Sequence, residues 1–317
     1  MSKHHFLEEI RFTNAESLLD YLRPCRSHWG DGTVIPWIFR GHANEKWDLL
    51  PKLWRQDGRQ FLEPLLRSHA ERRSDRGGWN AYQRFVSDTQ SLAANRELSG
   101  FVMNVARDAS AEAVFRFLKL ADELGLAMPE PFDAARGRSA LDHRTPCANT
   151  ALAQHHGIPT SLLDWTINPM VAAYFASQTT SDREADALAV WAYKLSPAEA
   201  NGEIRTRSLI QTKTFARSSA QYLHAQSGVF TWHGDIECDN FFFEHGRYPT
   251  LVDMLNASRG DPVGVCVRKL VLGRTHADVL TSLLLRERVT KAHLMPTLDN
   301  VAETSRQMWS PGNYHTA

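Results

Sequence analysis

The stretch from Gln154 to Thr166 reads QHHGIPTSLLDWT and decides how the rest of the chain is interpreted. It places two imidazoles, three alcohols, a carboxylate and an indole directly ahead of the apolar run Met170–Ala176. Asn168 and Pro169 predict the start of a helix over this run, with Asn as the N-cap and Pro at the first helical position. Because the helix is apolar almost all round, we expect it to be buried. Polar groups packed this densely beside a buried helix need partners, and a ligand is one of them.

Working outward, apolar runs bounded by turn residues predict strands. These lie at Val34–Arg40, Ala187–Tyr193, Gly228–Trp232 and Val263–Leu270. Helices are predicted at Ala15–Leu22, capped by Asn14, and at His276–Leu285. From residue 59 to 126, apolar positions recur at spacings of three and four, which predicts amphipathic helices that pack as a bundle or lid, and residues 134–150 read as an irregular connection. Strands separated by irregular stretches and by this mid-chain helical insert predict a mixed α+β fold.

Composition excludes several classes of protein. The 317 residues suffice for one large domain or two modest ones, and 36 basic residues balance 36 acidic ones. No overall field therefore attracts nucleic acid or an anionic membrane. No apolar run approaches the length of a membrane span, and the N-terminus lacks the apolar core of a signal peptide. The four cysteines form no Cys-x-x-Cys pair, so we expect reduced, mostly buried thiols in the cytoplasm.

The first candidate for chemistry is Arg40, at the end of an apolar strand. Its charge cannot be shed, so the side chain must leave the core or find a partner. A phosphate or carboxylate in a cleft would suit its planar fork, and a structural salt bridge to a buried acid is the alternative. Gly41 lets a ligand or another backbone approach, and Arg55 is a second arginine for the same region.

The second and third candidates are polar groups further along the chain. His155 and His156 are adjacent and do not share a helix face, and no ligand spacing supports a metal site. Asp164 either takes part in chemistry or orients a histidine or a turn. Gln226, at the mouth of a predicted strand, either bonds a ligand hydroxyl or stabilises a loop. Glycine-rich phosphate loops, dinucleotide fingerprints and the Gly-x-Ser-x-Gly elbow are missing from the sequence, which excludes the commonest NTPase, Rossmann and hydrolase classes.

Together these segments resemble the FRG domain, a family named for a Phe/Tyr-Arg-Gly motif. The residues that carry the resemblance are Phe39–Gly41, Trp47–Pro51 with Arg55, Gln154–Thr166 with Pro169, Ala225–Phe230 and Met295–Asp299. The resemblance implies a single domain over residues 6–301, with 59–150 as a helical insert or lid and 302–317 as a tail. It further implies a bacterial or phage-encoded protein linked to toxin or phage-defence systems, and a cognate antitoxin as partner.

The layout is also similar, more loosely, to ADP-ribosyltransferases of the arginine-serine-glutamate type. That likeness implies an ADP-ribosyltransferase-like split sheet and NAD as a substrate. Arg40 would hold the NAD phosphates or ribose, Thr166 would face the nicotinamide ribose, Gln226 would contact ribose hydroxyls, and Trp165 or Tyr174 would stack on nicotinamide. Gly228 stands where the catalytic glutamate of that family should be. Asp164, Asp235 and Glu237 are the carboxylates that could replace it.

Three functions follow from these residues. The first is an NAD-dependent ADP-ribosyltransferase or NAD glycohydrolase that modifies a protein or nucleic-acid target. The second is a non-catalytic module that binds or senses a nucleotide, which the missing glutamate favours. The third is a hydrolase or nuclease in which His155 or His156 is the general base and Asp164 orients it. All three require Arg40, Thr166 and Gln226, or the His–Asp pair, to share one cleft.

Overall fold

The computed structural model describes residues 6–30, 32, 36–88, 90, 93, 95–135, 137, 146–178, 185–195, 210–213, 226–233, 235–257 and 265–309. Several predictions concern residues outside this description. They are the start of the first predicted strand (Val34, Ile35), residues 138–145 of the predicted irregular connection, residue 225 of the motif Ala225–Phe230, residues 263 and 264 of the last predicted strand, and the tail beyond 309. The backbone of Asp235 and Glu237 lies within helix α10 (Asp235–His245), but their side chains are outside the description.

A mixed sheet forms the centre of the described chain. Its seven strands lie in the order β1-β7-β4-β2-β3-β6-β5. β1 and β7 are parallel, and the other neighbours are antiparallel. The strands are β1 Leu7–Phe12, β2 Trp37–His42, β3 Leu163–Thr166, β4 Ala187–Lys194, β5 Ile210–Lys213, β6 Gly228–His233 and β7 Val267–Gly273. Together with the helices they make an α+β fold, as the sequence predicted.

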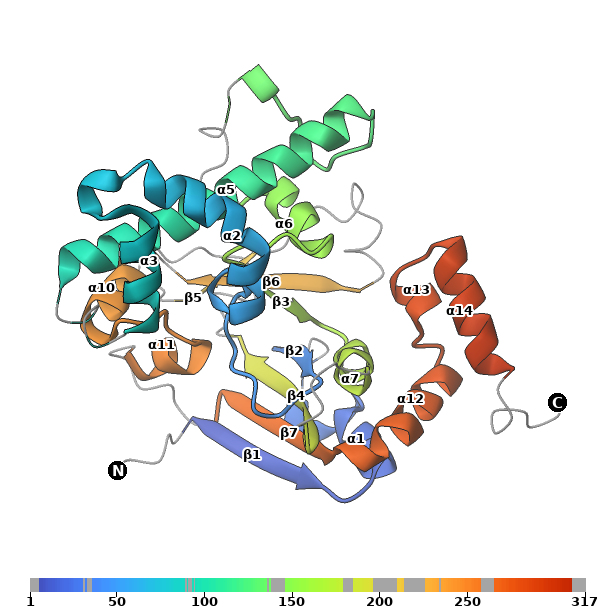
Figure 1. Ribbon diagram of the computed structural model, residues 1–317. Coiled ribbons are helices and arrows are strands. Elements are labelled where there is room, and N and C mark those ends of the chain that lie inside the picture. The colour runs from blue at the N-terminus through green and yellow to red at the C-terminus, as the bar shows by residue number, and fades with distance from the viewer. Residues whose placement is uncertain are drawn as a thin grey trace.

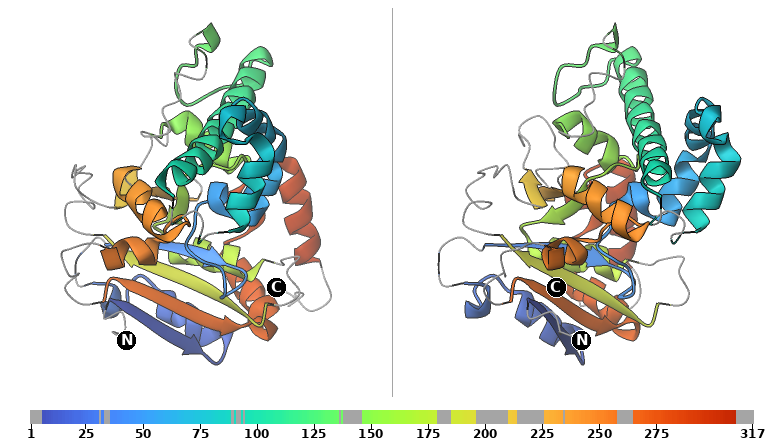
Figure 2. Two further views of the ribbon diagram at one scale, coloured as in Figure 1. Left: turned by 60° about the vertical axis from the view of Figure 1, so that its left-hand side comes forward. Right: turned by 90° about the vertical axis from the view of Figure 1, so that its left-hand side faces the viewer.

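Helices cover both faces of the sheet (Figures 1 and 2). On one face lie three helices of the mid-chain insert, α2 Gln56–Glu71, α3 Gly78–Ser87 and α5 Arg96–Glu123. They pack there with two later helices, α10 and α11 Leu251–Ala257. On the other face lie α1 Ala15–Leu22, α7 Pro169–Ser177 and α12 Ala277–Arg286. Alternate residues of β2 follow this division, because Ile38 packs in the first core and Phe39 in the second.

Local sequence signals explain the helix starts. Asn14 caps α1 by accepting a hydrogen bond from the backbone N–H of Ser17 at 2.8 Å. Asn168 caps α7 in the same way through Met170 N–H at 3.0 Å, with Pro169 at the first helical turn. Both helices are confirmed. α7 is apolar all round because it is wedged between the sheet and α12.

Other elements differ from the prediction. Strand β2 continues two residues beyond Arg40, to His42, and β7 begins only at Val267. A helix, α6 (Ala148–His155), begins inside the stretch expected to be irregular. β1 was not predicted, since it lies at the sheet edge and its charged sequence LEEIRF shows no fully buried residue. The C-terminal helices α13 (Lys291–Leu294) and α14 (Leu298–Met308) were also missed.

The cysteines and the helix lengths bear on the compositional predictions. None of the four cysteines forms a disulfide bond; Cys238 alone is buried, Cys147 and Cys266 are half-buried, and Cys25 is exposed. The expectation of mostly buried thiols is therefore wrong. Within the described ranges, no helix is both long and apolar enough to cross a membrane.

Candidate functional site

The sheet forks between β2 and β3, and a cavity lies at the fork. The register joins the two strands at one pair, Phe39 with Thr166, whereas β2 and β4 pair along six residues. The cavity has a volume of about 340 Å³. Its lining includes the three residues predicted to converge from distant segments, Arg40, Thr166 and Gln226, together with Asp164 and His155. The predicted convergence is therefore observed.

Gly41 fixes the position of the β2 side of the fork. A Cβ atom at this residue would lie 2.0 Å from the carbonyl oxygen of Ala172 and 2.5 Å from the backbone nitrogen of Ala176. Both atoms belong to α7, so the glycine permits the helix to lie directly on the strand. Of the two roles predicted for Gly41, close approach of another backbone is the one observed, although the residue also lines the cavity.

Arg40 spans the fork. Its Nη1 donates to the main-chain carbonyl of Asp164 at 2.7 Å and lies 3.5 Å from the carboxylate Oδ2. Burial lowers the pKa of the guanidinium from its ordinary value, and the Asp164 carboxylate opposes that shift. Within the described part of the chain, Nη2 has no hydrogen-bond partner. Arg40 is thus both a structural ion pair and a donor with capacity left for an anion.

His42 holds the other side of the same guanidinium. Arg40 Nε donates to His42 Nε2 at 3.0 Å. Since that ring nitrogen must accept, the proton is on Nδ1, which donates to the carbonyl of Trp47 at 3.2 Å. Burial, followed by the charge of Arg40, places the pKa of His42 well below its ordinary value. His42 is therefore a neutral positioning group for Arg40.

Asp164 is held by the central signature itself. Its carboxylate accepts a hydrogen bond from the Gln154 amide, whose oxygen accepts one from the Thr160 hydroxyl. Gln154 and Thr160 are buried, whereas the Asp164 side chain is 54% exposed. Thr160, Gln154 and Asp164 thus form a chain of two hydrogen bonds, which orients the Asp164 carboxylate at the cavity wall.

Thr166 and Gln226 line the cavity but also hold the backbone. The Thr166 hydroxyl donates to the carbonyl of Gln226 at 2.6 Å and accepts from Asn168 N–H at 3.0 Å. The Gln226 amide nitrogen donates weakly to the carbonyl of Leu294 at 3.4 Å. The Thr166 proton is therefore committed to the protein, and within the described residues the amide oxygen of Gln226 is the group that keeps its hydrogen-bonding capacity.

Two of the other predicted site residues take different places. Tyr174 lines a second cavity, against α12, rather than the fork. Arg55 is not among the residues that line the fork cavity, but its charge acts on both Arg40 and His42. Neither residue lines the fork cavity, where both were expected to contact the ligand.

Trp165 and His155 do reach the cavity. Trp165 contributes to the cavity wall, but its ring is buried and its indole N–H donates to Thr231 Oγ1 at 2.8 Å. Burial and the neighbouring His156 lower the pKa of His155, and Asp164 raises it. Within the described residues, no group of three His, Cys, Asp or Glu side chains is arranged to hold a metal ion.

An apolar wall completes the cavity and was not predicted. It is formed by Trp47, Phe175, Phe230 and Met295, of which Trp47 is 37% exposed. Trp47, Phe230 and Met295 all belong to the motifs that carry the family resemblance. Membership of these motifs was the sequence signal that could have identified them as cavity residues. An aromatic ring beside a guanidinium and a carboxylate suits a ligand with a flat face and polar edges.

Comparison with known proteins supports the family. The model of the FRG domain family matches residues 116–185. The chain therefore carries an FRG domain, as its central signature indicated. The matched residues include α6, β3 and α7, whereas Arg40 and Gln226 lie outside them. No curated protein and no solved structure matches the chain.

Proposed function

We propose that the fork cavity binds a nucleotide of the NAD class and that the chain is an NAD-dependent ADP-ribosyltransferase or NAD glycohydrolase. The observation that carries the proposal is the meeting of Arg40, Asp164 and Gln226, from three distant segments, around one cavity. Its volume of about 340 Å³ is at the lower end of ligand cavities, roughly 300–1,000 Å³. It accommodates one nucleoside half of a dinucleotide, with the remainder outside.

Each side chain has a role in this scheme. Arg40 Nη2 donates to a phosphate or ribose oxygen, and the Gln226 amide oxygen accepts from a ribose hydroxyl. Trp47 stacks on the nicotinamide ring. Gly228 occupies the position of the catalytic glutamate of the ADP-ribosyltransferases. We assign the role of that glutamate to Asp164, because its carboxylate lines the cavity. It lies on β3, whose Thr166 pairs with Gly228.

The chemical step is cleavage of the bond between ribose C1′ and the nicotinamide nitrogen. The bonding electron pair leaves with nicotinamide, and C1′ becomes an oxocarbenium cation that the Asp164 carboxylate stabilises. A water molecule, a protein side chain or a nucleophilic group of a nucleic acid then forms the new bond to C1′ and loses a proton to the solvent. Transfer to a protein or nucleic-acid target and hydrolysis differ only in this acceptor.

Release of nicotinamide from NAD tests the proposal. We expect turnover by the wild-type chain and a loss of roughly 100-fold or more in Asp164→Asn, since electrostatic stabilisers of a transition state contribute about that much. Asp20→Asn is the matched control. Asp20 also pairs with an arginine and its side chain is 55% exposed, but it lies on α1 away from the cavity. Equal turnover in wild type and Asp164→Asn would contradict the role of Asp164.

The second candidate is a nucleotide-binding module without catalysis. It is favoured by the commitment of the Thr166 hydroxyl to the backbone and by Gly228 at the position expected for glutamate. In that case NAD raises the melting temperature and no nicotinamide is released. A role as a toxin or phage-defence effector stays a prediction of the family resemblance, and loss of growth on expression in bacteria would test it.

A further inference from the structure

Helix α14 and its C-cap residue Trp309 present apolar side chains to solvent on one side. They are Leu298 (88% exposed), Val301 (47%), Met308 (45%) and Trp309 (64%), here called the α14 stripe. Their spacings of three, seven and one place them on a single face of a helix with 3.6 residues per turn. The opposite side packs on α13, through buried Thr304 and the Lys291–Glu303 ion pair. Figure 1 places α14 at the margin of the molecule, away from the sheet.

Charges beside the α14 stripe identify an occupant. Asp299 and Arg306 are both exposed and are seven residues apart, so they lie on the same flank near opposite ends of the stripe. When two copies of one helix pair antiparallel about a two-fold axis, each flank meets the same flank of its partner with the ends exchanged. Asp299 of one copy then lies beside Arg306 of the other, twice per pair. The surface is complementary to itself in both hydropathy and charge.

We propose that α14 is a homodimerisation helix, pairing antiparallel with the same helix of a second copy of this chain. The apolar contacts supply the affinity, and the two Asp299–Arg306 pairs set the direction. An interface built on one three-turn helix falls below the standard size of about 1,200 Å² in total, so the dimer dissociates on dilution.

Sedimentation velocity over a range of protein concentrations tests the pairing. We expect a monomer–dimer equilibrium in the wild type and a dissociation constant at least about tenfold higher in Val301→Glu, because a charge would enter the apolar stripe. Val279→Glu is the matched control: this valine is 45% exposed on α12, outside the stripe, and should leave the equilibrium unchanged. Circular dichroism checks that both variants fold.

Charge exchange tests the direction of pairing. Asp299→Arg alone and Arg306→Asp alone each set like charges against each other and weaken the dimer several-fold, whereas the double exchange restores it. A wild-type chain that sediments as a monomer at every concentration would overturn the proposal. So would a dimer that Val301→Glu leaves intact, or a double exchange that weakens association further than either single change.

Discussion

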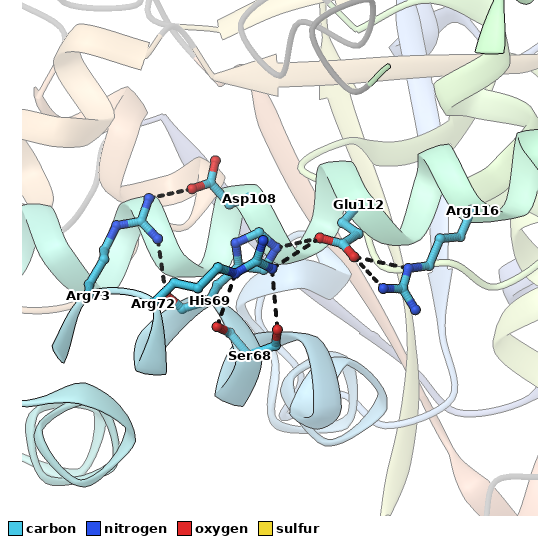
Figure 3. A network of polar contacts seen from close by, with 7 residues as sticks. All are labelled: Ser68, His69, Arg72, Arg73, Asp108, Glu112 and Arg116. Atoms are coloured by element: carbon cyan, nitrogen blue, oxygen red, sulfur yellow. Dashed lines mark hydrogen bonds and ion pairs between the residues drawn. The ribbon is translucent and has the colours of Figure 1, made fainter. Parts of the chain in front are cut away.

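Two regions of the molecule are built from the same chemical groups but differ in how many bonds those groups already make. In the fork network, defined as Arg40, His42, Gln154, Thr160 and Asp164, a guanidinium meets a carboxylate whose side chain is 54% exposed. In the insert network, drawn in Figure 3, the central carboxylate is Glu112, whose side chain is 11% exposed. Glu112 accepts hydrogen bonds from His69 at 2.8 Å, from Arg72 and from Arg116.

The difference separates a structural network from a candidate site. The insert network joins α2 to α5, and its carboxylate is surrounded by donors of the protein. In the fork network, Asp164 faces a cavity, and Arg40 Nη2 has no hydrogen-bond partner among the residues that the structure describes. Polar groups that the protein satisfies completely stabilise the fold, whereas groups with remaining capacity beside a cavity are available to a ligand.

The largest effect should come from the backbone beneath the fork network. Gly41→Ala would place a methyl group 2.0 Å from the Ala172 carbonyl, so α7 must move and unfolding becomes easier by about 3 kcal/mol or more. Gly100→Ala is the control, since nothing lies within 4 Å of its Cβ position in α5, and it should stabilise the chain by roughly 0.5–1 kcal/mol. Urea unfolding of both variants measures the difference. Near-equal stabilities would contradict the close packing of β2 and α7.

The second effect compares the two carboxylates directly. Glu112→Gln replaces a mostly buried acceptor of three side chains and should cost about 2 kcal/mol. Asp164→Asn changes an exposed partner and should alter stability by less than about 1 kcal/mol. Chemical denaturation of the two variants gives both values. If Asp164→Asn lowered the free energy of unfolding more than Glu112→Gln, the fork network rather than the insert network would be the one that stabilises the fold.

The smallest effect concerns pH. The pKa of His42 lies well below its ordinary value of 6.5, chiefly through burial, and burial also lowers that of His69, where Glu112 opposes the shift. Below pH 6.5 these two histidines take up protons in the unfolded chain but not in the folded one. Their contribution to the free energy of unfolding is therefore fully present above pH 6.5 and falls as the pH is lowered. His42→Gln should flatten this fall more than His69→Gln, as measured by thermal unfolding at several pH values. The reverse order would assign the acid sensitivity to the insert.

The sequence predicted those parts of the fold that depend on local signals. Asn168 and Pro169 identify the start of α7, and the apolar run of β4 identifies a strand buried on both faces. β1 gave no such signal, because half of its six residues are charged and the adjacent Glu8 and Glu9 break the alternation expected of a strand. α6 was missed because it is short and its buried side comes chiefly from alanines and Gln154.

The sequence predicted which residues would meet at the site but not which hydrogen bonds each of them would make. The order of Arg40, Thr166 and Gln226 along the chain was enough to expect convergence, which the cavity bears out. The sequence could not reveal that Thr166 would give its proton to a backbone carbonyl, or that Tyr174 would face α12. Such directions depend on contacts between segments far apart in the sequence, such as the packing of α7 on Gly41, and no local sequence signal encodes them.

The capacity of Arg40 to bind an anionic nucleotide is the central claim, and titration calorimetry of NAD into the wild-type chain and Arg40→Gln measures it most directly. We predict saturable binding by the wild type and an affinity at least about tenfold lower in Arg40→Gln, since a charge-assisted hydrogen bond is lost. Equal affinity in the two proteins, or no heat of binding with a folded wild type, would contradict it.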